Sequence, residues 1–135
     1  MIYLKTFENI NQEQQNSDYI QQLIDEYMAY LIDDGYGIYS EYHTSRSIKN
    51  YSVKIYKGIC RPPFTSFDII DIYDDLLSFI EIMEIKGYVL FNCEVSLIGM
   101  KPGDSIEYSK EDVIEQSIDN FQIKYMYLNF DKKSN

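Results

Sequence analysis

Apolar positions along this chain switch between a period of three to four residues and a period of two, and these switches outline its elements. The longer period runs from Ser17 to Asp34 and predicts an amphipathic helix that Gly35 ends in a left-handed conformation. The period changes to two over residues 36–43 and again over residues 51–57, which predicts a β-hairpin with a polar turn.

A second helix and two further strands follow. The helical period returns after a cap at Thr65 or Ser66 and continues to about Lys86, with an apolar stripe of Ile69, Tyr73, Leu76, Ile80 and Met83. Residues 88–98 form the clearest strand and residues 121–130 the last one, with a short helix capped by Ser109 between them. We expect the apolar row of the clearest strand to face both helices and to be the most buried part of the domain. This row consists of Val89, Phe91, Cys93, Val95 and Leu97.

Together these elements predict an α+β fold, a two-layer sandwich with two main helices on one face of an antiparallel four-stranded sheet. The 135 residues are expected to form one domain, because this length can bury a core without metals or disulfides. Residues 1–16 are interpreted as an N-terminal arm, a short strand and then a loop, that could add an edge strand, and residues 131–135 as a frayed tail. Both halves contain a helix, a Gly-Tyr pair and two strands, which leaves open whether they are a true duplication.

The net charge of −10 disfavours direct binding to nucleic acid and to anionic membranes, because both require an attractive positive field. No apolar run is long enough to cross a membrane, and the opening lacks the pattern of a signal peptide. We therefore expect a cytoplasmic protein in which Cys60 and Cys93 are reduced thiols, whose role the sequence leaves open.

Charge is distributed unevenly along the chain. Residues 1–43 contain eight acidic side chains and one basic one, whereas residues 44–63 contain five basic and no acidic ones. The second helix carries carboxylates opposite its apolar residues, and this acidic helix face is the first candidate binding surface. Its members are Asp68, Asp71, Asp74, Asp75 and Glu81. The basic hairpin is the second candidate, with Arg46, Lys49, Lys54, Tyr56 and Lys57. A simpler explanation of both charged surfaces would be that the basic hairpin pairs with the acidic helices of the same chain.

Patterns of catalytic or metal-binding residues are missing from the sequence. His43 is the one histidine, and no nucleophile elbow, cysteine pair or calcium-type loop accompanies it. We therefore expect no catalytic residue, no metal and no cofactor. Residues 86–91 resemble part of the RNA-recognition-motif signature, but its later aromatic residue is missing and the surrounding charge is negative.

The first eight residues, MIYLKTFE, resemble the start shared by many small uncharacterised accessory proteins of tailed bacteriophages, with isoleucine at position 2 where lysine is usual. The resemblance implies a phage accessory protein in the cytoplasm of a bacterial host and supplies no catalytic residue. Such proteins often act by occupying a surface of a host enzyme, sometimes in place of DNA.

The leading hypothesis is a non-enzymatic, acidic protein-binding module, an inhibitor or modulator of a basic or nucleic-acid-handling host protein. A structural component of a virion or other assembly is one alternative, and an unrecognised small hydrolase or nucleotide-binding enzyme is another. Exposed carboxylates without basic neighbours would favour the first hypothesis. A self-complementary edge strand would favour the second, and a pocket containing His43 the third. The partner, the oligomeric state and the host stay open.

Overall fold

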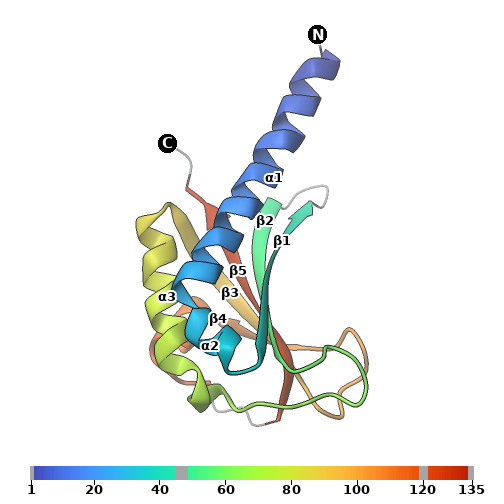
Figure 1. The fold of residues 1–135 in the computed structure, drawn as a ribbon, viewed down its shortest axis with the longest axis vertical. Coiled ribbons are helices and arrows are strands. Elements are labelled where there is room, and N and C mark those ends of the chain that lie inside the picture. The colour runs from blue at the N-terminus through green and yellow to red at the C-terminus, as the bar shows by residue number, and fades with distance from the viewer. Residues whose placement is uncertain (1, 45–48, 119–121, 134–135) are drawn as a thin grey trace.

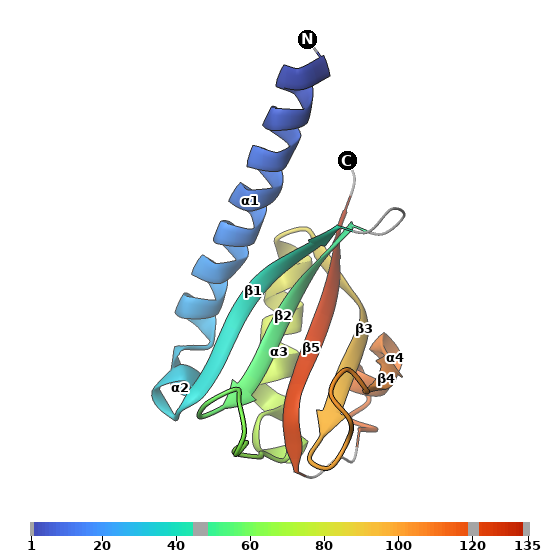
Figure 2. The ribbon, with the colours of Figure 1, turned by 90° about the vertical axis from the view of Figure 1, so that its right-hand side faces the viewer.

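The fold was obtained as a computed structural model that describes residues 2–44, 49–118 and 122–133; of residues 2–11, 43, 44 and 49 it describes the backbone alone. The predicted α+β class is confirmed, with helices packed against an antiparallel sheet of five strands (Figure 1). The order of the strands across the sheet is β1 (Tyr36–Thr44), β2 (Lys49–Lys57), β5 (Ile123–Lys132), β3 (Tyr88–Leu97) and β4 (Ile106–Ser109). The long helices lie on one face, and no helix of the described residues crosses the other face (Figure 2).

The N-terminal segment is helical, so the prediction of a strand or arm and a loop over residues 1–16 is wrong. Helix α1 spans Ile2–Tyr27, and its first turns extend past the end of the sheet (Figure 1). The stretch contains neither glycine nor proline, and its polar side chains bond each other one turn apart, as from Gln14 to Asp18 at 2.9 Å. The fifth strand of the sheet is the edge strand β4, which residues 106–109 supply instead of the N-terminal segment.

The second helix begins at Tyr73 instead of near Thr65. Thr65 and Phe67 form isolated bridges with Lys57 and Ile123, so pairing with the end of the sheet replaces the predicted first turns. A 3-10 turn, η1 (Ile69–Asp71), leads into α3 (Tyr73–Ile85). The predicted apolar stripe is confirmed, because all of its members are buried. They are Ile69, Tyr73, Leu76, Ile80 and Met83.

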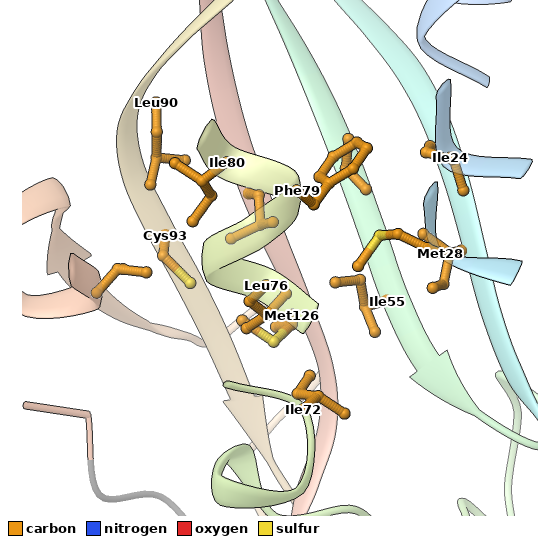
Figure 3. Packing of buried hydrophobic residues seen from close by; sticks show 14 of the residues in the cluster. Ile24, Met28, Ile55, Ile72, Leu76, Phe79, Ile80, Leu90, Cys93 and Met126 are labelled. Carbon is orange, nitrogen blue, oxygen red and sulfur yellow. The ribbon is translucent and has the colours of Figure 1, made fainter. Parts of the chain in front are cut away.

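A bulge in β3 corrects the predicted apolar row. The register between β3 and β5 shifts between Leu90 and Asn92. The prediction is therefore wrong for Phe91, which turns outward and is 37% exposed, and for Val89, which is only half-buried, whereas Leu90 takes the inward position and is 2% exposed. Beyond the bulge, Cys93 faces the core as predicted, and Figure 3 shows Leu90 and Cys93 beside the α3 side chains.

Similarity between the two halves extends to their backbone hydrogen bonds. Gly35 follows α2 (Ala29–Asp33) and Gly87 follows α3, with φ of +96° and +98°. The Gly35 carbonyl accepts from Gly58 N at 2.8 Å, and the Gly87 carbonyl accepts from Lys133 N at 2.8 Å. In each half the glycine thus joins the helix end to the far end of the second strand.

The remaining predicted elements differ little from the structure. The hairpin is confirmed as β1 and β2. Ser109 forms the predicted capping box with Asp112 at the start of α4 (Lys110–Ile114). Strand β5 extends to Lys132, so it includes the first residues of the predicted tail, whose last two residues lie outside the described ones.

Candidate functional site

Carboxylates from separate segments gather around Tyr36 at one end of the domain. Asp34 lies in the turn before β1, Asp68 and Asp71 lie before α3, and Asp75 lies in its first turn. Burial raises the pKa of the Tyr36 hydroxyl, and the negative charges of these four groups raise it further, Asp71 most of all. We refer to Asp34, Asp68, Asp71 and Asp75 as the acidic end.

The local fold explains part of this arrangement. Asp68 accepts a hydrogen bond from the backbone N–H of Gln122 at 3.0 Å, so it also holds the chain before β5. Asp75 lies at the N-terminus of α3, where the helix dipole favours a negative charge. Neither role applies to Asp34. It follows the C-terminus of α2, where the dipole of α2 disfavours a negative charge.

No carboxylate of the acidic end forms a salt bridge with a lysine or arginine of the described residues. The cation of Lys57 lies over the Tyr36 ring, 5.3 Å from its centroid, and so reduces the local negative charge only in part. The simpler explanation, in which the hairpin neutralises the acidic helices, therefore does not account for these four carboxylates.

The predicted acidic helix face is divided in the structure. Asp68 lies before the helix, whereas Asp74 and Glu81 are exposed on α3 and are not among the groups that act on Tyr36. Asp34 was missing from the predicted set. The Asp33-Asp34-Gly35 sequence indicated the end of the first helix, but only the fold brings that turn beside η1.

The basic hairpin does not form one surface among the described residues. Arg46 and the side chain of Lys49 lie outside them, as does the side chain of His43. Lys54 and Tyr56 lie on the face of the sheet away from the helices, whereas Lys57 lies over Tyr36 on the helix side.

Tyrosines cluster on the face of the sheet that no described helix crosses. Tyr39 and Tyr56 stack with centroids 6.0 Å apart and planes at 22°. The Lys54 cation lies 4.9 Å from the ring centroid of Tyr125 and 5.5 Å from that of Tyr127. We refer to these four tyrosines and Lys54 as the tyrosine face. Its β2 members follow from the predicted alternation, whereas its β5 members were not identified in the sequence.

Gly37 determines how this face is packed. A Cβ at Gly37 would overlap the Tyr56 ring, because it would lie closer to the ring atoms than their van der Waals contact distance. The ring can therefore lie against the β1 backbone only because residue 37 is glycine. Burial raises the pKa of the Tyr56 hydroxyl to about 12, and its hydrogen bond with Tyr39 contributes in the same direction.

The Cys93 thiol is poorly placed to act as a nucleophile. Cys93 is buried, and that burial raises the pKa of its thiol to about 12, which opposes formation of a nucleophilic thiolate. Within residues 2–44, 49–118 and 122–133, no histidine, cysteine and carboxylate side chains group together to hold a metal ion. No helix in those ranges has the length and apolar character to cross a membrane. Comparisons with protein families, curated proteins and solved structures found no match.

Proposed function

We propose that this chain is a non-enzymatic protein-binding module that presents its acidic end to a basic partner protein. The convergence of Asp34, Asp68, Asp71 and Asp75 without a salt bridge to the described residues carries this proposal. Like charges held close together reduce the stability of a fold, and a cationic partner would relieve that repulsion. The same field would steer a basic partner toward the surface and raise the association rate.

A nucleic-acid-handling protein is the partner class that fits this field best. Such proteins carry basic surfaces that neutralise phosphates, and a compact group of carboxylates can compete for the same surface. The resemblance of the opening residues to phage accessory proteins supports an inhibitor or modulator that acts on a host protein in the bacterial cytoplasm. Direct binding to nucleic acid is opposed by the net charge of −10.

The partner protein must first be identified. The tagged chain is used to capture proteins from an extract of the bacterial host, captured proteins are identified by mass spectrometry, and the purified partner is titrated with the wild type. The test variant carries Asp34→Asn, Asp71→Asn and Asp75→Asn, and it retains Asp68 because that side chain holds Gln122. A control variant carries Glu81→Gln, Glu84→Gln and Glu115→Gln, which remove the same charge from exposed positions elsewhere.

The test variant should lose roughly 3- to 100-fold in affinity at 0.1 M salt, on the basis of about 0.2–1 kcal/mol for each exposed charge pair. The control should lose much less, and the difference should shrink as the Debye length falls from about 10 Å to about 3 Å at 1 M salt. Thermal unfolding shows that both variants remain folded. Equal losses in the two variants, or an affinity that does not respond to salt, would reject the acidic end as the binding surface.

A further inference from the structure

The tyrosine face is a second surface, separate from the acidic end. In Figure 2, α3 lies behind the sheet and no described helix crosses its front, so this face is turned to solvent at Tyr39, which is 51% exposed. Its neighbours on the same face include small and polar residues, namely Gly37, Ser52, Asn92 and Asn129. Tyrosine with serine, glycine and asparagine is the composition of antibody combining sites, in which rigid rings provide contact area and amides provide hydrogen bonds.

Hydrogen bonds hold this face in one arrangement before any partner arrives. Ser52 donates to the Asn129 side chain at 2.5 Å, Asn129 donates to Asn92 at 2.6 Å, and Asn92 donates to Glu107 at 2.9 Å. These bonds link β2, β5, β3 and β4 across the sheet. Because the amides and rings are already ordered, a partner would bind with a smaller loss of conformational entropy.

One row of this face indicates the chemistry of the partner. The register places Tyr39, Lys54, Tyr127, Glu94 and Glu107 side by side on successive strands, which spans about 19 Å at about 4.8 Å per strand. Lys54 is half-buried and lies against two rings, so the row presents aromatic surface at one end and carboxylates at the other. The negative charge of Glu41 also acts on Tyr127.

We propose that this row binds an arginine-rich segment of a protein partner that lies across the strands. Along this row one guanidinium of the segment can stack on the Tyr39 ring while another donates paired hydrogen bonds to Glu94 or Glu107, and a lysine ammonium has neither the planar face nor the paired donors. Glu94 and Glu107 would repel the phosphates of a nucleic acid, so the aromatic rings are matched to arginine instead of to bases. The inference does not rest on the proposed role of the acidic end.

The probes are a labelled octa-arginine peptide, an octa-lysine peptide of equal charge, and a single-stranded oligonucleotide, each titrated by fluorescence anisotropy. The wild type should bind octa-arginine several-fold more tightly than octa-lysine and should bind the oligonucleotide most weakly. Tyr39→Ala should reduce the arginine affinity by about 3- to 10-fold with little change for lysine, and Tyr39→Phe should restore it. Glu94→Gln together with Glu107→Gln should reduce it as well.

Tyr27→Ala is the matched control, because Tyr27 is 44% exposed on the helix side, and it should leave both affinities unchanged. The triple variant of the acidic end should weaken both peptides alike and keep the preference for arginine, so the two proposals fail separately. Thermal unfolding confirms that each variant is folded. Equal affinity for both peptides, a preference that survives Tyr39→Ala, or tightest binding of the oligonucleotide would each overturn the inference.

Discussion

The side-chain amide of Gln21 occupies the free edge of β1 at Ser40. The Ser40 N–H donates to Gln21 Oε1 at 2.8 Å, and Gln21 Nε2 donates to the carbonyl of Ile38 at 3.3 Å. The amide thus takes the place that a neighbouring strand would take, and so protects part of an edge that could otherwise add another chain. The other edge strand, β4, has four residues. Both features disfavour strand addition, the kind of contact that would have favoured the alternative of a structural component of a virion or other assembly.

Gln21→Ala should expose this edge. The loss of two hydrogen bonds in a partly buried position should lower the free energy of unfolding by about 1–3 kcal/mol, as measured in urea. Sedimentation velocity should show a larger average mass than the wild type at the same concentration. Gln22→Ala is the control because its side chain is exposed on the next position of α1. An unchanged mass and stability would show that the amide does not protect the edge.

Leu90→Ala and Phe91→Ala test the bulge in β3. Leu90 is 2% exposed, so Leu90→Ala should lower the free energy of unfolding by about 2–5 kcal/mol, through lost transfer energy and the cavity that remains. Phe91 is exposed, so Phe91→Ala should lower the free energy of unfolding by less than about 1 kcal/mol. Urea unfolding of both variants gives the comparison. A larger cost at Phe91 would restore the unbroken alternation that the sequence indicated.

Most elements of the fold could be predicted because their apolar periods are regular. The stripe of α3 and the alternation of β2 both lie where expected. The bulge at Phe91 could not be predicted, because Leu90 and Phe91 are both apolar and periodicity cannot indicate which one turns inward. The N-terminal helix was missed because its polar residues are also typical of loops.

The candidate surfaces could be predicted only in part. Asp68, Asp71 and Asp75 are near one another in the sequence, so their common location was expected. Asp34 joins them through the packing of α2 and β1 beside η1, which no local pattern shows. Likewise, Tyr127 is brought beside Lys54 by the pairing of β2 with β5, between segments far apart in the chain.

Gly37→Ala should be destabilising because the added Cβ meets the Tyr56 ring. We expect a loss of about 1–3 kcal/mol, typical of overpacking. In a Tyr56→Ala background the same change should be nearly neutral, since the ring that causes the clash is absent. A double-mutant cycle measured by urea unfolding gives the coupling between the two sites. A coupling near zero would mean that Gly37 is required for another reason.

The stability of the protein should fall at alkaline pH because buried tyrosines resist ionisation. Burial, aided by the charges of Tyr51 and Tyr19, raises the pKa of Tyr88 from 10.0 to about 12. Above pH 10 the unfolded chain loses this proton while the folded chain keeps it, so the folded state binds more protons. The contribution is therefore fully present below pH 10 and is lost as the pH rises to about 12. Cys93, with a pKa of about 12, acts in the same direction.

Tyr88→Phe isolates the tyrosine contribution, since it removes the ionisable group and keeps the ring that packs edge-on against Tyr51. Urea unfolding at pH 8, 10 and 11 should show a gain in the stability of the variant relative to the wild type as the pH rises. Tyr30→Phe should show no such gain, because Tyr30 is 85% exposed and folding does not bury its hydroxyl. If Tyr88→Phe and the wild type lose stability in parallel between pH 10 and 11, the alkaline transition must come from other groups.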